Sequence, residues 1–420
     1  MNPRGGAGAA QKKRLLFVAY GGGHVNMIIP VVKEFSNDPS VEVNILGLTR
    51  AGATLDNESI PYFGFRHLPE SKDPIAIEWG EQLALGVEHE AVPRAETIAY
   101  LGLSYLDLIH DQGVETARRL YEKQGRQAFL PVRTLQNVMR RLSPDVVIAT
   151  NSPRAERAAI MAARDFGIPA VCLVDLLALH EIEYIGVEDY ADRICVMSQF
   201  VKQLFLAAGR KDEEVVVTGN PAFDRLSDPS LPASADRLRS QRGWGSDKVI
   251  LWASNVEPAR HPFSGHKGDP ELPRRVDLAL FELIKRHPDW RLVIRPHPSE
   301  VLQYDSLPER VEISNGEPLP PLLKACDVVV TLASTVGLEA VLLGKPLVSI
   351  DLSIFTPDLP YAKMGLSTGV TSLIDLEAGI LRALTSKVLT NLELPEVGTS
   401  AARITEVIRQ LIHFPLTGQS

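Results

Sequence analysis

Short apolar runs alternate along the chain with longer segments of helical periodicity. Residues 15–20, 145–150 and 249–254 are rich in aliphatic and β-branched side chains, which is typical of strands buried on both faces of a parallel sheet. Turn residues and then helix-like segments follow these runs, and the pattern restarts at 249 after a polar, helix-prone stretch at 226–245. This alternation predicts an α/β protein with two doubly wound, Rossmann-like domains.

The length of the chain supports the same division. A chain of 420 residues is longer than one ordinary hydrophobic core organises. The Gly-Asn-Pro sequence at 219–221 is strong turn punctuation and marks a crossing between domains. We therefore predict a flexible tail over 1–14, an N-terminal domain over 15–222, a C-terminal domain over 223–395 and a final helix within 396–420.

Composition narrows the class of protein. A hydrophobic fraction of 45% and a charged fraction of 23% are typical of soluble globular proteins, and a formal net charge of −8 argues against a nucleic-acid partner. Cys172, Cys195 and Cys326 lie in apolar runs without a C-x-x-C pair, which predicts reduced core residues in a cytoplasmic protein. No apolar run has the length of a membrane span. Peripheral binding at the inner face of a membrane is the one form of membrane contact that stays open.

A tight β-α-β unit over 322–351 carries the strongest candidate chemistry. A buried strand is predicted at 327–332, and Ser334 and Thr335 then offer hydroxyl groups where a helix would begin. A helix N-terminus at the carboxyl end of a strand suits a phosphate group, because unpaired N–H groups and the helix dipole both favour an anion. Glu339 lies one turn along, within reach of a ribose diol. The alternative is an ordinary N-cap followed by a surface glutamate.

Three further loops follow predicted strands. The first contains Gly22, Gly23 and His24, where glycines allow a sharp turn and close approach to a ligand. The second, 255–268, begins at Asn255, and the third is Arg-Pro-His-Pro at 295–298, where prolines fix the histidine and the arginine can donate to a phosphate in bidentate fashion. Because strand carboxyl ends share one edge of a sheet, we expect these loops to converge on a ligand. The alternatives are a capping histidine and a solvated connector.

The sequence predicts no metal site and no cofactor. No D-x-D segment follows a strand, and His261 and His266 share a loop without a cysteine or acidic partner at convincing ligand spacing. The helix dipole and Arg295, with His266 or Lys267, would then supply the positive charge for an anionic ligand. A G-x-S-x-G elbow is missing, and the glycine loop lacks the downstream acidic residue of nicotinamide-binding proteins.

Several of these segments resemble one enzyme superfamily. S-T-x-G-L-E-A-x-x-L-G-K-P at 334–346 resembles the donor-nucleotide segment of GT-B glycosyltransferases and their relatives, among them lipid-A-disaccharide synthase, the UDP-N-acetylglucosamine 2-epimerases and the CDP-glycerol and capsule-polymer transferases. V-T-G-N-P-x-x-D at 217–224 is similar to their interdomain segment, and R-P-H-P to the HP motif of the capsule-polymer group. The glycine-rich loop is similar to their first loop, except that Pro30 comes one residue later.

The resemblance implies a role for each candidate. His24 would be the catalytic base on the acceptor side, Ser334, Thr335 and His297 would contact the donor phosphates, and Glu339 would bind the ribose. It also implies that the C-terminal helix packs back on the N-terminal domain. The predicted nucleotide-sugar site comprises Gly22, Gly23, Asn255, Arg295, His297, Ser334, Thr335, Gly337 and Glu339.

We therefore expect a metal-independent, inverting glycosyltransferase that moves a sugar from a nucleotide donor, UDP-linked, to a cell-envelope polysaccharide, glycolipid or small-molecule acceptor. One alternative is a nucleotide-sugar 2-epimerase or hydrolase, although those epimerases carry an arginine in the first loop and a glycine-rich acidic donor loop. The others are a CDP-polyol or CMP-sugar capsule-type transferase, and a non-catalytic nucleotide-sugar sensor. Sugar, base, acceptor and oligomeric state are left open.

Overall fold

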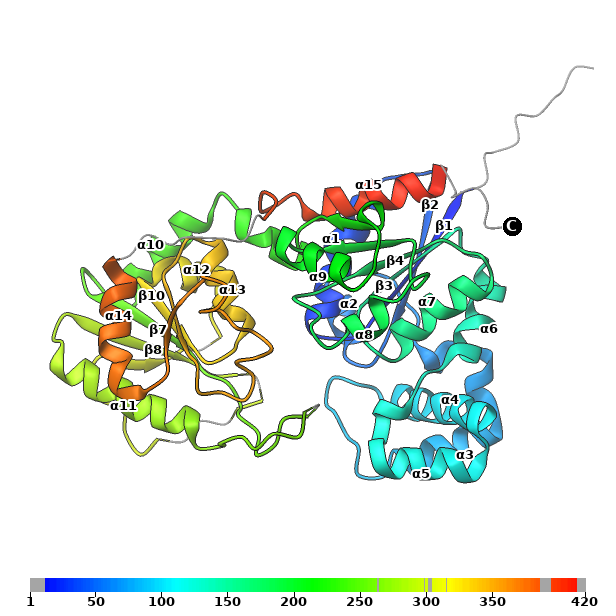
Figure 1. The fold of residues 1–420 in the computed structure, drawn as a ribbon, viewed down its shortest axis with the longest axis horizontal. Coiled ribbons are helices and arrows are strands. Elements are labelled where there is room, and N and C mark those ends of the chain that lie inside the picture. The colour runs from blue at the N-terminus through cyan, green and yellow to red at the C-terminus, as the bar shows by residue number, and fades with distance from the viewer. Residues whose placement is uncertain are drawn as a thin grey trace, which may run out of the picture. The chain divides into compact units, whose positions relative to one another are not determined.

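The computed structural model describes residues 12–262, 264–297, 299–300, 304–314, 316–385 and 394–413. The chain forms two compact units. Unit 1 contains Met1–Asp224 and Leu394–Ser420, and unit 2 contains Arg225–Glu393. Each unit is built on its own six-stranded sheet (Figure 1). The predicted fold class, two doubly wound α/β domains, is confirmed.

The sheet of unit 1 is parallel and has the order β2-β1-β3-β4-β5-β6. Its strands are β1 (Lys13–Ala19), β2 (Val41–Gly47), β3 (Val146–Thr150), β4 (Ala170–Leu173), β5 (Arg193–Val196) and β6 (Val215–Val217). The predicted tail over 1–14 is too long, because Lys13 and Arg14 already belong to β1. The Asp145 carboxylate holds both of them, through the Lys13 Nζ at 2.9 Å and the Arg14 backbone N–H at 2.8 Å. The rest of that tail, 1–11, lies outside the described residues.

Helices cover this sheet, and one of them comes from the far end of the chain. They are α1 (Gly23–Phe35), α2 (Ala51–Asn57), α7 (Ala155–Asp165), α8 (Ile182–Ile185), α9 (Gln199–Ala207) and α15 (Ser400–His413). Helix α15 lies beside α1 and adds Ile404 and Ile408 to the core of unit 1 (Figure 1). The Asp224 carboxylate accepts the backbone N–H groups of Ser400 and Ala401, and so caps the start of α15.

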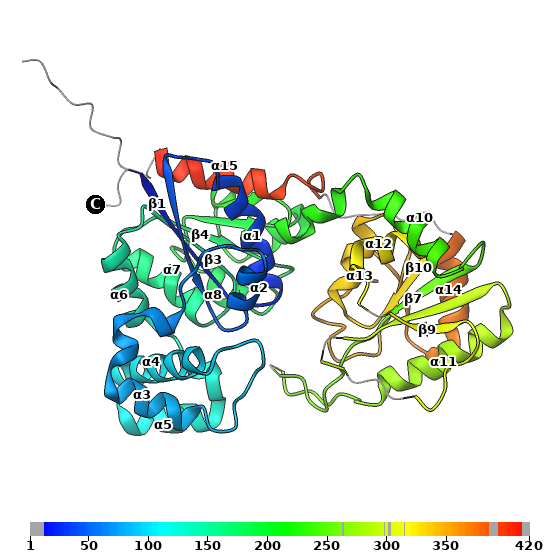
Figure 2. The same ribbon diagram turned by 180° about the vertical axis from the view of Figure 1, so that it is seen from behind.

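Four further helices lie between α2 and β3 along the chain. They are α3 (Pro74–Leu83), α4 (Arg94–Gln112), α5 (Val114–Gln124) and α6 (Val132–Leu142). Figure 2 shows α3, α4 and α5 packed together beside the sheet. A Cβ atom on Gly102 would lie 1.9 Å from the Ala76 carbonyl oxygen, and one on Gly80 would lie 2.2 Å from that of Ile98. The two glycines therefore let α3 and α4 approach to backbone contact.

Unit 2 repeats the architecture with the parallel order β12-β11-β10-β7-β8-β9. Its strands are β7 (Lys248–Ala253), β8 (Trp290–Arg295), β9 (Val311–Ile313), β10 (Val328–Thr331), β11 (Leu347–Ile350) and β12 (Thr368–Val370). Its helices are α10 (Leu231–Gln241), α11 (Leu272–Arg286), α12 (Leu319–Ala325), α13 (Thr335–Leu342) and α14 (Leu376–Thr385). Short 3₁₀ turns in the two units lie at Phe65–His67, Pro69–Lys72, Gly125–Ala128, Asp212–Glu214, Pro221–Ser227 and Leu373–Asp375.

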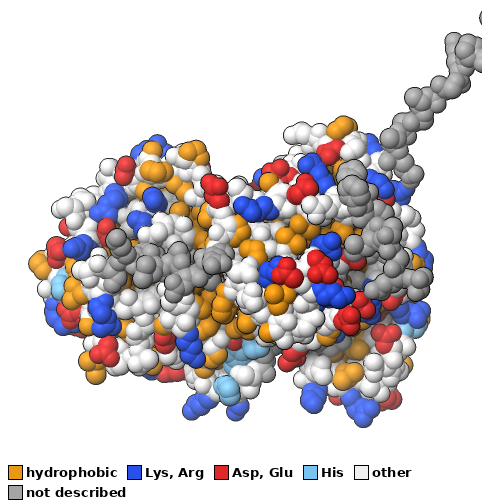
Figure 3. Space-filling model, turned by 45° about the horizontal axis from the view of Figure 1, so that its top comes forward, with side chains coloured by type: hydrophobic (Ala, Val, Ile, Leu, Met, Phe, Trp, Pro, Cys, Tyr) orange, Lys and Arg blue, Asp and Glu red, His pale blue; other side chains and the backbone are white. Residues whose placement is uncertain are grey.

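Several compositional expectations can be compared with the structure. Cys172, Cys195 and Cys326 are buried, unpaired core residues, as predicted, and burial raises the pKa of the Cys195 thiol to about 12. Acidic and basic side chains are interspersed on the face that Figure 3 shows. Among the helices of the described residues, none combines the length and the apolar character that a membrane crossing requires.

Candidate functional site

Each sheet has one point where its strand order reverses. In unit 1 the chain moves from β1 outward to β2 and then returns to β3 on the other side of β1. In unit 2 it moves from β7 outward through β8 and β9 and then returns to β10 on the other side of β7. Loops diverge at such a switch point and leave a crevice outside the carboxyl ends of the strands, where α/β proteins bind ligands. The candidate residues follow these strands.

Helix α13 begins at the switch point of unit 2. Ser334 is its N-cap in extended conformation, and the Ser334 hydroxyl oxygen accepts the Val336 N–H at 3.3 Å. Thr335, the first helical residue, is exposed. The buried Tyr361 donates its hydroxyl proton to the Ser334 carbonyl at 2.7 Å, which fixes the entry into the helix. The predicted hydroxyl-capped helix start is therefore present, and Tyr361 is a support that the sequence did not reveal.

Glu339 lies in the second turn of α13 and is not a surface residue, since only 5% of it is exposed. Its carboxylate accepts a charged hydrogen bond from Arg225 at 2.5 Å, and the Arg225 side chain is 45% exposed. Burial raises the pKa of Glu339, and the positive charges of Arg225 and Arg295 partly oppose that rise. Arg225 is a functional candidate that sequence reasoning missed, because it is 114 residues away in the chain.

Arg295 ends β8 and is half-buried. Its guanidinium donates to the Glu317 carbonyl oxygen at 3.0 Å and lies 3.4 Å from the Ser314 hydroxyl. Burial lowers the pKa of Arg295, and the negative charge of Glu339 opposes that effect. The charges of Arg295 and Glu339 therefore influence each other, and their contact with one ligand stays a prediction.

Asn255 and Gly337 make different kinds of contact near the end of β10. The Asn255 side-chain oxygen lies 3.4 Å from the hydroxyl of Thr331, the last residue of β10. Gly337 is buried, and a Cβ there would lie 3.1 Å from the Tyr361 ring and 3.2 Å from Leu347. Gly337 thus allows α13 to pack closely on its neighbours, and its contact with a nucleotide stays a prediction.

The contacts of His297 differ from those of Arg295, the other predicted residue of its loop. It is exposed, its Nδ1 accepts the Ser299 N–H at 3.1 Å, and its own backbone N–H donates to the Glu300 carboxylate at 3.1 Å. These contacts are local to its turn, so the assignment of His297 to the donor phosphates stays a prediction. The second proline of the motif, Pro298, lies outside the described residues.

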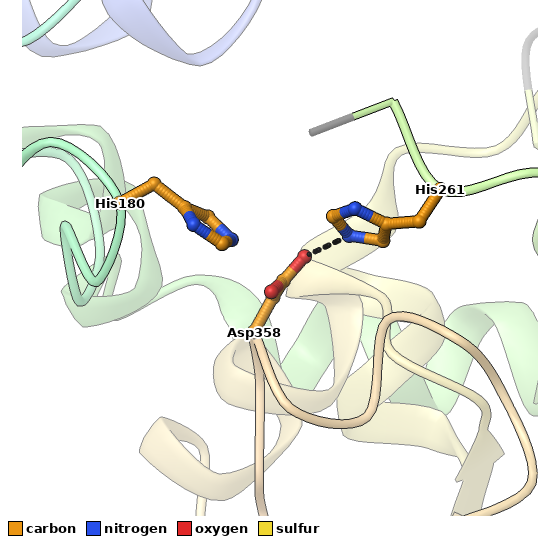
Figure 4. A group of neighbouring side chains, drawn as sticks. All are labelled: His180, His261 and Asp358. Atoms are coloured by element: carbon orange, nitrogen blue, oxygen red, sulfur yellow. Dashed lines mark hydrogen bonds and ion pairs between the residues drawn. The ribbon is translucent and has the colours of Figure 1, made fainter. Parts of the chain in front are cut away.

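The long loop after β7 is fastened to the loop after β11. The His261 ring accepts the Ser264 N–H at Nδ1, at 3.0 Å, so Nε2 of the neutral ring carries the proton and donates to Asp358 at 2.8 Å (Figure 4). Glu257, also buried, accepts the Ser353 hydroxyl at 2.7 Å. His261, considered above for metal binding, forms hydrogen bonds that shape the loop bearing Asn255. The third residue labelled in Figure 4, His180, belongs to unit 1.

In unit 1 the glycine-rich loop follows β1. Gly22 has φ +72°, a conformation that L side chains rarely adopt, and a Cβ on Gly21 would lie 2.6 Å from the Arg50 Cβ. Gly23 is the first residue of α1, so His24 lies in the first helical turn. These glycines therefore allow the backbone turn that positions His24.

His24 faces the end of the neighbouring strand. Its Nδ1 lies 2.7 Å from the hydroxyl of Thr150, the last residue of β3, and 3.9 Å from the carboxylate of Glu156 in the first turn of α7. Thr150 donates to that carboxylate, and both residues are 0% exposed. Sequence reasoning missed them because it did not determine that β1 and β3 are neighbours. A hydroxyl at a strand end followed by an acidic residue in the next helix was the available signal.

A second polar group joins other strand ends of this sheet. The side chains of Asn151 and Asp175 are hydrogen-bonded at 3.1 Å, and the Asp175 carbonyl oxygen accepts the Asn220 amide at 2.5 Å. Asn151 follows β3, Asp175 follows β4, and Asn220 follows β6. The sequence identified Asn220 as a turn residue. The side chains of Asn151 and Asn220 also fix the spacing of loops at the carboxyl edge.

Comparisons with known proteins relate the chain to one family model and to solved structures. Residues 277–358 match the family model described as capsule polysaccharide biosynthesis protein. That segment includes β8, Arg295, α13 and Asp358. A search of curated proteins finds no match.

Solved structures are similar over nearly the whole chain. UDP-GlcNAc 2-epimerase from Neisseria meningitidis, bound to UDP-GlcNAc, has a TM-score of 0.59 at 14% identity and covers 94% of this chain and 100% of its own. A putative UDP-N-acetylglucosamine 2-epimerase from Listeria monocytogenes has a TM-score of 0.60 at 16% identity, covering 97% and 98%. The glycotransferase of kitacinnamycin has a TM-score of 0.53 at 15% identity, covering 96% of both chains. The chain therefore has the GT-B fold.

Proposed function

We propose that the protein is a glycosyltransferase that uses a nucleotide-activated sugar, UDP-linked, as its donor. Unit 2 binds the nucleotide, and His24 of unit 1 takes the proton of the acceptor hydroxyl. The acceptor is a cell-envelope polysaccharide, a glycolipid or a small molecule. Direct displacement at the anomeric carbon with one base implies inversion of configuration, and the protein supplies positive charge to the leaving diphosphate without a metal.

One observation carries the proposal: a hydroxyl-capped helix N-terminus and a buried carboxylate lie on α13, beside the switch point of unit 2. The helix start suits a diphosphate, since its dipole and N–H groups favour an anion. Glu339, one turn further, is placed to accept hydrogen bonds from a ribose diol, and Arg295 adds a cation within electrostatic range. Ribose binding would replace or share the hydrogen bond that Glu339 now accepts from Arg225.

The comparisons favour two narrower alternatives. The match to the capsule polysaccharide family over 277–358 favours a capsule-type transferase with a CDP- or CMP-linked donor. The named activity of several structural neighbours favours a UDP-GlcNAc 2-epimerase. Against the epimerase, the first loop here carries His24 without an arginine, and the loop before α13 carries Ser334 and Thr335 in place of glycine and acidic residues.

Thermal unfolding with UDP, CDP, CMP, GDP and dTDP tests the donor class. A ligand that binds only the folded protein stabilises it by about 2.7 kcal/mol at 100 times its Kd. We expect UDP to raise the midpoint most. A larger shift with CDP or CMP favours the capsule-type donor, and no shift with any nucleotide contradicts the proposal. Incubation with UDP-GlcNAc alone separates the epimerase, which would form the C2 isomer without an acceptor.

A further inference from the structure

His24 is tied to a fully buried carboxylate through one hydroxyl group. Strands β1 and β3 pair in parallel, with Val18 opposite Ala149, so the turn after β1 lies beside the end of β3. Three segments that are distant in sequence then supply one hydrogen-bonded row, from His24 Nδ1 to Thr150 Oγ1 to Glu156 Oε1. Such an arrangement specifies more than position, because each bond also restricts where protons reside.

The protons in this row can be assigned from what each group is able to donate. An ionised carboxylate only accepts, so Glu156 Oε1 accepts the Thr150 hydroxyl proton as well as the Tyr20 backbone N–H at 2.9 Å. A threonine hydroxyl has one proton, and it is used in that bond. Thr150 Oγ1 is therefore an acceptor toward His24, and Nδ1 of the neutral ring must carry the proton. This leaves the unprotonated nitrogen, a proton acceptor, at Nε2.

We infer that Thr150 and Glu156 are positioning residues that hold His24 in the tautomer with Nδ1 protonated and Nε2 able to accept a proton. The inference rests on the proposed function and deepens it. The acceptor hydroxyl would give its proton to Nε2, and its oxygen electron pair would form the bond to the anomeric carbon. The bond from that carbon to the donor phosphate oxygen would break, with its electrons going to the diphosphate. The resulting imidazolium keeps its Nδ1–H bond to Thr150, and the Glu156 charge, 3.9 Å from Nδ1, stabilises it.

The surroundings of Glu156 make the row rigid. Thr150 and Glu156 are both 0% exposed, whereas the His24 side chain is 24% exposed, so one end is anchored and the other is accessible. Within the described residues Glu156 Oε2 has no hydrogen-bond partner, so the donors gather on the oxygen that faces Thr150. The Tyr20 ring packs beneath the Arg154 guanidinium at 4.9 Å, and its hydroxyl is bonded to Tyr100. These contacts fix the backbone N–H that also holds Glu156.

The tautomer can be measured in the ligand-free wild-type protein. Histidine labelled with ¹⁵N reports which ring nitrogen carries a proton, and the signal of His24 is assigned by its loss in His24→Gln. At a pH where the ring is neutral, we expect His24 to carry its proton on Nδ1. A ring protonated mainly on Nε2 would overturn the inference, whatever the catalytic activity turns out to be.

Matched variants then connect the tautomer with turnover. Thr150→Val keeps the shape and removes the hydroxyl, so we expect a mixed tautomer and a kcat lowered by ~10–10²-fold, less than the ~10²–10⁴-fold attributed to a general base, with the donor KM kept. Thr150→Ser keeps the hydroxyl and should restore both readouts. Glu96→Gln is the control, because Glu96 is equally buried and accepts the N–H groups of Phe65 and Arg66 outside this row. It should leave the His24 spectrum unchanged.

The outcomes separate the two proposals. An Nδ1–H tautomer that is lost in Thr150→Val, in a protein that transfers no sugar, supports the positioning role and contradicts the proposed function. If the wild-type ring carries its proton on Nε2 while turnover depends on His24, the proposed function is supported and the positioning role is contradicted. If Thr150→Val does not fold, the wild-type spectrum and Thr150→Ser still decide, because unaltered turnover in Thr150→Ser with an Nε2–H ring contradicts the inference.

Discussion

The two units place a buried glutamate at equivalent points of their sheets. In each, the strand that returns beside the first strand ends in a threonine, Thr150 of β3 or Thr331 of β10, and the next helix carries the glutamate. Glu156 lies in the first turn of α7, and its donors are the neutral groups of Thr150 and Tyr20. Glu339 lies in the second turn of α13 and pairs with the Arg225 guanidinium.

This difference in partners distinguishes a fixed carboxylate from an exchangeable one. Glu156 is fully enclosed, and its neutral donors belong to the backbone and to a buried side chain, so its hydrogen bonds can act only on other protein groups. Glu339 faces a long arginine whose side chain is 45% exposed. If this side chain moves aside, a ligand diol must replace the hydrogen bond that the buried Glu339 loses. In these proposals one fold element serves orientation in unit 1 and recognition in unit 2.

The largest effect is expected when the imidazole of His24, the accessible end of the hydrogen-bonded row in unit 1, is removed. His24→Ala should lower kcat by ~10²–10⁴-fold with donor affinity kept, because a base is lost and no donor contact is. Steady-state turnover with UDP titration measures both quantities. His110→Ala, an exposed histidine on α4, is the control. Near-normal turnover in His24→Ala, or a product of retained configuration, contradicts the role of His24 as the base.

The next largest effect is expected when the exchangeable carboxylate of unit 2, that of Glu339, is removed. Glu339→Ala should weaken UDP binding by about 10–100-fold, the value of a hydrogen bond to a charged group, while pyrophosphate binding changes little. Calorimetric titration of both ligands is the measurement, and Glu282→Ala, an exposed residue on α11, serves as the control. Equal losses for UDP and pyrophosphate would remove the ribose assignment.

Asp107 on α4 is a third buried carboxylate, and like Glu156 it accepts its hydrogen bond from a neutral group. Burial raises the pKa of Asp107 on α4 from 3.8 to about 6, against the hydrogen bond from the Thr134 N–H at 2.9 Å. A folded pKa above the unfolded value means stability that is present at low pH and lost as pH rises through about 6.

Between pH 5 and 8 the wild type should lose about 1–2 kcal/mol relative to Asp107→Asn, which keeps the acceptor oxygen but does not titrate. Urea unfolding at the two pH values measures this difference. A difference that does not change with pH would show that Asp107 is ionised in the folded protein at both values.

The last prediction is that removing metal ions has no effect on turnover. Arg295 and the start of α13 supply positive potential in unit 2, so we predict that turnover is unchanged after treatment with EDTA. The assay compares chelated protein with the same sample after magnesium or manganese is added back. Activity that disappears on chelation and returns with either metal would contradict the metal-independent proposal.

Local patterns in the sequence determined much of this protein. Apolar runs predicted the strands, the Ser334–Thr335 pair predicted the start of α13, and three successive glycines predicted the turn before His24. These signals are local, because an apolar run, a capping hydroxyl and a glycine that permits a positive φ each occupy a few consecutive residues. The resemblance at 334–346 and at 295–298 added the expectation of a GT-B fold.

Only the tertiary structure decided which side chains meet. Thr150 and Glu156 reach His24 because β3 returns beside β1, and Arg225 reaches Glu339 across 114 residues of chain. Strand order in a parallel sheet depends on how all the crossover helices pack, so no short window of sequence encodes it. The close packing of Tyr361 and Leu347 around Gly337 was likewise visible only in the folded structure.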